Sequence, residues 1–170
     1  MMRQLGQILV AGGCIKDEQL EHALLIQKRS GSRLGDILVS EGFVGFYDLY
    51  QALAKHFGLS FVDLLKDPPE NHLLVNGIPP ESFLHYRLLP WRRADDGTVT
   101  VAVTEYSQEI IEWCKQQFGD SVQFVITSPF DIRRTIENEF GAKLETSSRL
   151  ALWQKFPAIS ARITVPENQR

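Results

Sequence analysis

The 170-residue sequence contains only two cysteines, Cys14 and Cys114, which lie a hundred residues apart. That spacing argues against a disulfide framework, and neither thiol has a second one at metal-ligand spacing. No apolar run approaches the ~20 residues that a membrane-spanning helix needs. Polar residues follow from Arg3 onward, unlike the start of a signal peptide. We therefore expect buried thiols and a cytoplasmic chain, or the cytosolic part of an inner-membrane protein.

The sequence also lacks an excess of basic residues. Its 18 Lys and Arg against 21 Asp and Glu give a net charge of -3, which argues against a general nucleic-acid binder. A small phosphorylated ligand stays compatible, because one pocket can be electropositive in a mildly acidic protein. The phosphate-loop pattern G-x-x-x-x-G-K-[ST] is absent, and the four histidines show no metal-ligand spacing. No catalytic residue, metal site or enzyme activity is predicted.

An internal repeat is the strongest signal in the sequence. Residues 4–27 (QLGQILVAGGCIKDEQLEHALLIQ) align with residues 33–56 (RLGDILVSEGFVGFYDLYQALAKH) at an offset of 29 residues. A five-residue joint, KRSGS, links the two copies. Repeats at a fixed period indicate a duplicated structural unit. Nine positions are identical: Leu5/Leu34, Gly6/Gly35, Ile8/Ile37, Leu9/Leu38, Val10/Val39, Gly13/Gly42, Leu20/Leu49, Ala23/Ala52 and Leu24/Leu53.

Each copy predicts a short helix, a glycine break and a longer helix. Leu5 and Leu9 form an apolar stripe, and Gly13 suits a helix end that needs a positive φ. Asp17 and Glu18 place negative charge in the first turn of the longer helix. Four such helices can pack as a bundle, in which pseudo-twofold symmetry brings the two Leu-Gly turns together.

A separate α/β unit is predicted after the repeat. Its expected order is β-β-α-β-α, preceded by a short helix at residues 81–85 that Pro79-Pro80 introduces. The strands are expected at residues 86–91, 98–104 and 122–126, and the helices at residues 108–118 and 129–140. The fold class is therefore α+β. We assign residues 1–60 to the helical repeat, 61–141 to the small α/β subdomain and 142–170 to a partly ordered tail.

Several polar residues favour a structural interpretation. Asp95 and Asp96 precede Gly97 and are typical turn formers between two strands, not a catalytic pair. Trp91-Arg92-Arg93 suits a solvated strand end better than a basic docking surface. His22 is expected on a solvated helix face.

The doubled motif and its five-residue joint resemble MshEN-type domains, the N-terminal domains of type II secretion and type IV pilus ATPases. The resemblance covers residues 3–141 and rests on the pattern R-L-G-x-x-L-V-x-x-G-x-I-x-x-x-x-L-x-x-A-L-x-x-Q. It implies a non-catalytic regulatory domain that binds cyclic di-GMP, with each copy gripping one half of the ligand and no other cofactor. The implied contact residues are Arg3, Gln4, Leu5, Gly6, Leu9, Val10, Gly13, Leu20, Leu24, Gln27, Arg33, Leu34, Gly35, Asp36, Leu38, Val39, Gly42, Leu49, Leu53 and His56.

Two departures from the motif matter for binding. Gln4 replaces the arginine of the first copy, with Arg3 adjacent, and His56 replaces the last glutamine of the second copy. Arg33, the motif arginine that is present, offers a planar fork for a phosphate or a guanine edge. The alternative function is a protein-protein docking domain that binds no nucleotide. The resemblance leaves the parent open between a secretion or pilus ATPase and an NfrB-type membrane glycosyltransferase, and it implies a membrane-associated partner.

Overall fold

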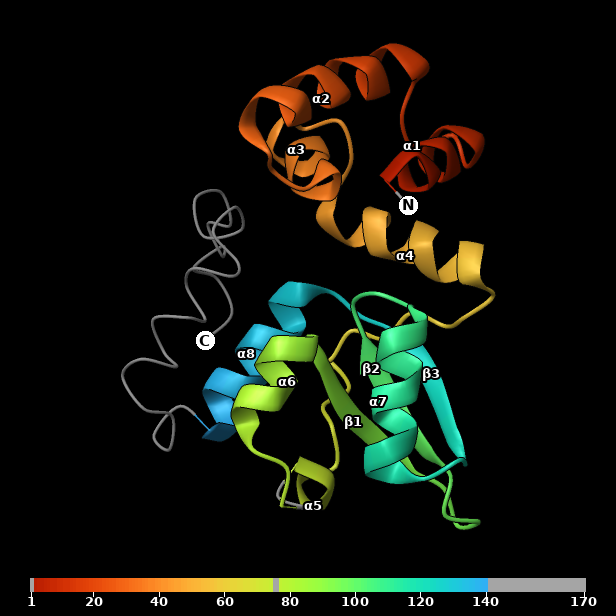
Figure 1. Ribbon diagram of the computed structural model, residues 1–170, viewed down its shortest axis with the longest axis vertical. Helices are drawn as coiled ribbons and strands as arrows, with labels where there is room; N and C mark the ends of the chain where they lie inside the picture. Colours follow the sequence, from red (N-terminus) through yellow and green to blue (C-terminus); the bar gives the residue numbers. More distant parts are fainter. Residues whose placement is uncertain (1, 75–76, 141–170) are drawn as a thin grey trace.

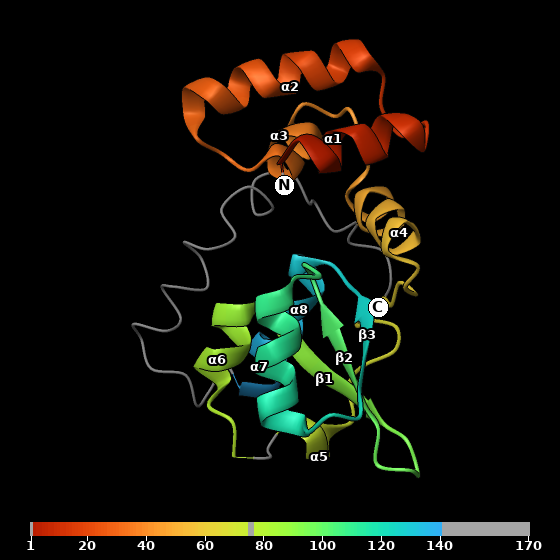
Figure 2. The ribbon, with the colours of Figure 1, turned by 45° about the vertical axis from the view of Figure 1, so that its right-hand side comes forward.

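The computed structural model describes residues 2–74 and 77–140, with the helical repeat at one end and the sheet at the other (Figure 1, Figure 2). The expectation for residues 142–170 lies outside the described residues. The repeat folds into the two pairs of helices that its sequence predicts. They are α1 (Met2–Ala11), α2 (Asp17–Ser30), α3 (Leu34–Ser40) and α4 (Phe46–Phe57).

The turns that join the helices of each pair are equivalent. Gly13 and Gly42 take left-handed backbone angles, with φ of 70° and 72°, which a side chain would disfavour. The hydrogen bonds that close the turns match at the 29-residue offset. They run from Cys14 N to Leu9 O at 2.8 Å and from Phe43 N to Leu38 O at 2.9 Å. The duplication is therefore one of backbone structure as well as sequence.

The glycines of the two Leu-Gly pairs, which lie in helices α1 and α3, allow close packing of helices. A Cβ on Gly6 would lie 2.3 Å from a methyl carbon of Leu20, and one on Gly35 would lie 3.2 Å from a methyl carbon of Leu49. The same Gly35 position is 3.9 Å from a methyl carbon of Leu5. The Leu-Gly pair of the first copy, in α1, thus meets that of the second, in α3.

A three-stranded sheet forms the second part of the described chain, in the order β1-β2-β3. β1 and β2 are antiparallel, and β2 and β3 are parallel, so a helix must cross over between the last two. The elements are α5 (Asn71–Leu74), α6 (Pro80–Tyr86), β1 (Leu88–Arg93), β2 (Val99–Val103), α7 (Gln108–Phe118), β3 (Val122–Ile126) and α8 (Pro129–Phe140). The predicted α+β fold is confirmed.

Two details differ from the prediction. β1 begins two residues later than expected, because α6 continues through Tyr86 and ends at Arg87, a non-glycine residue with a φ of 53°. The four-residue helix α5 is not predicted at all, since it is too short to show a periodic pattern.

Among the described residues, the hydrophobic interior consists of two clusters. One lies among the repeat helices, and the other is built around the sheet. Val101, Ala102 and Val103 are all fully buried in β2. Because successive strand residues face opposite sides, both faces of the sheet are covered there. Tyr50 of α4 packs against both clusters, so this helix connects the two parts.

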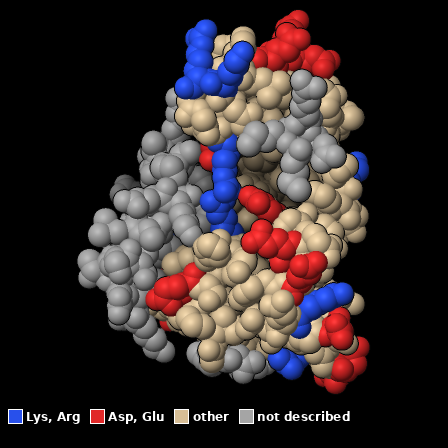
Figure 3. Space-filling model, in the orientation of Figure 1, with Lys and Arg blue, Asp and Glu red and all other residues tan. Residues whose placement is uncertain are grey.

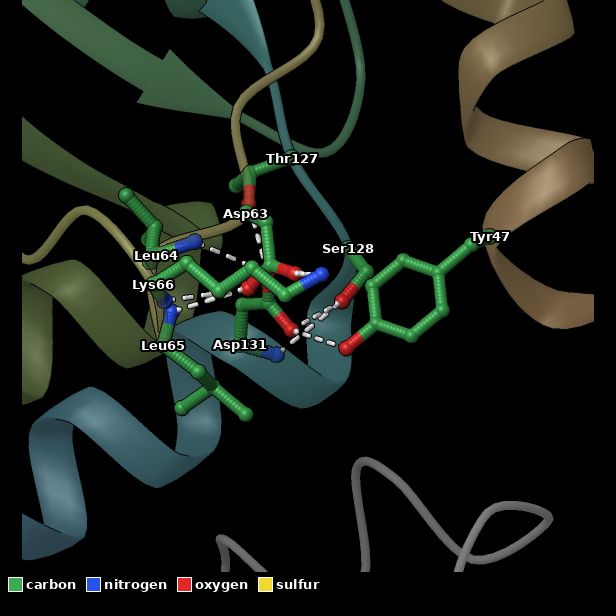
Figure 4. Close-up of polar contacts among 8 residues, drawn as sticks. All are labelled: Tyr47, Asp63, Leu64, Leu65, Lys66, Thr127, Ser128 and Asp131. Atoms are coloured by element: carbon green, nitrogen blue, oxygen red, sulfur yellow. Dashed lines mark hydrogen bonds and ion pairs between the residues drawn. The ribbon is translucent and has the colours of Figure 1, made fainter.

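Asp131 at the start of α8 forms a buried joint between these parts (Figure 4). Its side chain accepts hydrogen bonds from the Tyr47 hydroxyl of α4 at 3.2 Å and from the Leu64 amide at 3.0 Å. It also accepts bonds from the hydroxyls of Ser128 at 2.8 Å and Thr127 at 3.4 Å. Burial is the main cause that raises the pKa of this carboxyl group. The joint ties helix α4 to the turn between β3 and α8.

The polar residues that favour a structural role are placed as follows. Asp96 accepts a hydrogen bond from the Thr98 amide in the β1-β2 turn at 2.8 Å, which confirms the turn prediction. Trp91 donates to the Asp67 carbonyl at 3.0 Å, and Arg92 pairs with the Asp67 carboxylate. Of the three residues 91–93, only Arg93 is exposed, so this strand end is less solvated than expected. The two thiols also differ, since Cys114 is buried and Cys14 is half-buried.

Candidate functional site

The predicted contact residues divide by their exposure. The side chains of Arg3 and Gln4 lie outside the described part of the structure. Six residues are buried within the repeat: Gly6, Leu9, Leu20, Leu34, Leu38 and Leu49. Eight are half-buried: Leu5, Val10, Leu24, Gln27, Gly35, Asp36, Val39 and Leu53. Four are exposed: Gly13, Arg33, Gly42 and His56.

The buried leucines act as core residues in this conformation. Leu9 and Leu38 have no exposed surface, and Leu20, Leu34 and Leu49 are at most 5% exposed. A ligand would therefore meet the half-buried and exposed members first. The buried leucines pack in the core and so position the backbone of the half-buried and exposed contact residues.

The ends of the two motif copies differ in their contacts. Gln27 donates from its side-chain amide to the Ser32 carbonyl at 2.9 Å, so it holds the joint that leads to Arg33. His56 is exposed, and its ring lies edge-on to Phe57 with the centroids 5.1 Å apart. Of the two equivalent positions, Gln27 thus makes a hydrogen bond to the joint between the copies, whereas His56 makes an aromatic contact.

Arg33 reaches from the repeat to the sheet. It is the N-cap residue of α3, and its backbone is extended. Its guanidinium Nη1 lies 3.0 Å from Oε1 of Glu105, the second residue after β2. Arg87 Nη1 lies 3.8 Å from the same oxygen. One carboxylate therefore lies between two arginines, one from each part of the molecule.

Asp36 and Tyr50 lie in the electrostatic field of this pair. The pKa of the half-buried Asp36 is raised by burial and lowered by Arg33. Burial raises the pKa of Tyr50 well above its usual value, and Asp36 and Glu105 add to the rise while Arg33 opposes it. Tyr50 therefore keeps its proton and can donate a hydrogen bond at neutral pH. We call Arg33, Asp36, Tyr50, Arg87 and Glu105 the junction cluster.

A cavity of about 280 Å³ opens beside the junction cluster. Lys or Arg and Asp or Glu side chains face one another in the region between the upper and lower parts of the molecule (Figure 3). The polar side chains that line the cavity come from both parts: Arg33, His85, Arg87, Glu105, Ser107 and Glu109. The arrangement offers hydrogen-bond donors and acceptors to a polar ligand at the edge of the repeat.

Sequence reasoning missed Arg87, Tyr50 and Glu105. Glu105 lies in the loop that follows β2, at the carboxyl end of a parallel strand pair. That edge is where α/β units place ligand-binding residues, so its position was a usable signal. Arg87 and Tyr50 join the cluster only through tertiary packing.

Within residues 2–74 and 77–140, no group of three or more His, Cys, Asp or Glu side chains is placed to hold a metal ion. In the same ranges, no helix is long and apolar enough to cross a membrane.

The fold and the site define an α+β module with two parts. Helix α4 connects a duplicated helical repeat to a three-stranded sheet. The chain belongs to the MshEN domain family, whose family model matches residues 57–146. That match covers the sheet and begins after His56, the last residue of the second motif copy. It therefore supports the resemblance through the part of the chain that lies outside the doubled motif.

Solved structures extend the similarity into the repeat. A structure of MshE with cdg is 28% identical, with a TM-score of 0.68, and the match covers 79% of this chain and 97% of that one. A share of 79% is about 134 of 170 residues, more than the 114 that follow His56, so it includes part of the repeat. The N-terminal domain of XpsE, 23% identical with a TM-score of 0.59, covers 78% and 91% of the two chains and shows the same fold.

Two longer proteins are similar in sequence. The type IV pilus assembly ATPase PilB of Myxococcus xanthus (strain DK1622) is 26% identical over 143 residues, which are 84% of this chain and 25% of PilB. Bacteriophage adsorption protein B of Escherichia coli (strain K12) is 30% identical over 127 residues, which are 74% of this chain and 16% of that protein. The chain thus spans a quarter or less of the length of these relatives.

Proposed function

We propose that this chain is a non-catalytic regulatory domain whose helical repeat binds cyclic di-GMP. The observation that carries the proposal is the duplicated backbone. Two copies with matching turns at a 29-residue offset meet through Leu5 and Gly35. A ligand made of two identical halves suits a site made of two equivalent units.

The similarity to MshE supports the choice of ligand. The MshE structure contains cdg, an abbreviation of cyclic di-GMP, and its similarity to this chain extends into the repeat. The exposed guanidinium of Arg33 can donate to a phosphate or to the O6 and N7 atoms of a guanine. The half-buried Leu5, Val10, Leu24, Val39 and Leu53 supply apolar surface for the bases.

The alternative is a docking domain of the same fold that binds no nucleotide. Two observations favour it: Gln4 stands where the motif has an arginine, and five of the motif leucines are buried in the core. Under either function, the domain would serve a larger cytoplasmic or membrane-associated machine. The proposed parent is a secretion or pilus ATPase, or a membrane glycosyltransferase. The similarity to PilB and to bacteriophage adsorption protein B supports this choice.

Calorimetry with the isolated chain tests the proposal. Cyclic di-GMP should bind with a Kd in the low micromolar range or tighter, about -8 kcal/mol or better, and with one ligand per chain. Linear pGpG is the matched control and should bind more weakly, since it lacks the fixed ring. Absence of heat, together with absence of competition at a large excess of ligand, would favour the docking function.

A further inference from the structure

The Arg33–Glu105 ion pair crosses from one part of the molecule to the other. Its residues are 72 positions apart in sequence, and their side chains are 54% and 58% exposed. Arg33 belongs to the proposed ligand site, whereas Glu105 belongs to the sheet and to no motif of the repeat. At the equivalent position of the first copy, Gln4 carries no charge and so cannot form an ion pair.

We propose that Glu105 is a positioning residue that competes with the ligand for Arg33, so that binding exchanges a carboxylate for a group of the nucleotide. This inference rests on the proposed function. A guanidinium has one planar fork of N–H donors. With Nη1 directed at Glu105, part of that fork is occupied by an internal carboxylate. The ligand must therefore displace an internal anion before Arg33 can bind it fully.

The geometry makes this exchange easy. Arg87 lies 3.8 Å from the oxygen that Arg33 contacts, and its side chain is only 16% exposed. Glu105 therefore keeps a cationic neighbour when Arg33 leaves. Because breaking the pair leaves no isolated charge behind, the cost of exchange is that of an exposed ion pair, which is small.

The test measures cyclic di-GMP affinity in variants of the whole chain. Glu105→Gln should tighten binding roughly two- to fivefold, the range expected for loss of an exposed competing pair. Glu139→Gln is the matched control, since Glu139 is an exposed residue of α8 outside the cavity lining and its change alters the net charge equally. It should leave the affinity nearly unchanged. Equal gains in both variants would mean that general charge, and not competition, controls binding.

A double variant separates competition from a structural role. In an Arg33→Ala background, Glu105→Gln should have no effect on affinity, because Glu105 acts only through Arg33. A persistent effect would overturn the inference. Weaker binding by the single variant Glu105→Gln than by the native chain would also overturn the inference, because it would mean that Glu105 contacts the ligand.

The two proposals fail in different ways. If neither the native chain nor Glu105→Gln binds, the proposed function fails and the competition model fails with it. If both bind with equal affinity, the proposed function stands and the competition model alone is wrong. If only Glu105→Gln binds measurably, both are supported, and the ion pair is a stronger inhibitor than its exposure implies.

Discussion

At the scale of single residues, the main asymmetry of the repeat is between Arg33 and Gln4. Residues 1–60 hold six Lys or Arg and six Asp or Glu, so they provide no broad positive field for a ligand with two phosphate charges. Recognition must then depend on individually placed groups. Arg33 is the motif arginine that is present, and its side chain is more than half exposed.

Arg33→Ala should weaken cyclic di-GMP binding by about 10- to 150-fold, because a charge-assisted hydrogen bond contributes roughly 1.5–3 kcal/mol. Gln4→Ala should cost about 1 kcal/mol, the value of a neutral bond. Titration of both variants beside Arg3→Ala decides which residue serves the first copy. An equal loss in Arg3→Ala and Arg33→Ala would assign that role to Arg3. If no arginine affects the affinity, the implied contacts are misplaced.

The paired glycines Gly6 and Gly35 allow a second test of single residues. Gly6→Ala should lower the free energy of unfolding by about 1–3 kcal/mol, because the new Cβ would lie 2.3 Å from the buried Leu20. Gly35→Ala should change it by less than about 1 kcal/mol. Its 3.2 Å contact with Leu49 needs only a small shift, which the better helix propensity of alanine offsets. Urea unfolding measures both. A larger loss at Gly35 would contradict this packing analysis.

At the scale of elements, α4 and the start of α8 are held together through Asp131. Its carboxyl is fully buried, and its pKa is raised mainly by burial and also by the nearby Asp63, while bonds from Ser128, Leu64 and Tyr47 oppose the rise. A raised pKa means that the folded protein holds this proton more tightly than the unfolded chain. The stability from this group is therefore full below its unfolded pKa of about 3.9 and is lost as pH rises through the folded value.

Asp131→Asn should remove this pH dependence. Relative to the variant, the native chain should gain unfolding free energy as the pH falls from about 7 to about 4. Urea unfolding at several pH values measures the difference, and Asp95→Asn in the exposed β1-β2 turn is the charge-matched control. An opposite slope would show that hydrogen bonds to the ionised carboxylate outweigh burial.

Local signals explain how much of these elements the sequence predicts. Gly13, Gly42 and the Pro79-Pro80 pair mark breaks that depend on a few neighbouring residues, and the helices and strands between them follow. The short helix α5 and the helix end at Arg87 carry no such signal. The pairs Arg33–Glu105 and Tyr47–Asp131 join residues 72 and 84 positions apart. They exist only once the chain has packed, so these contacts between the two parts of the molecule could not be predicted.

At the scale of the whole molecule, the proposed ligand site and the contact between the two parts share Arg33 and helix α4. Helix α4 carries residues of the second motif copy. Its Tyr50 also packs against the cluster around the sheet, and its Tyr47 donates a hydrogen bond to Asp131. A ligand that contacts both motif copies would therefore contact α4, the helix that connects the repeat to the sheet. It can shift the arrangement of the parts only by its difference in affinity for the two states.

Hydrogen exchange with and without cyclic di-GMP tests this shared site. A ligand that bridges both copies should slow exchange in α1 and α2 as well as in α3 and α4, because opening either pair of helices would break contacts to the same molecule. The strands β1–β3 should change less, since no predicted contact residue lies in them. Linear pGpG at matched occupancy is the control for effects of nucleotide binding alone. Protection of only one pair of helices would mean that the ligand occupies one motif copy, and the doubled repeat would then need another explanation.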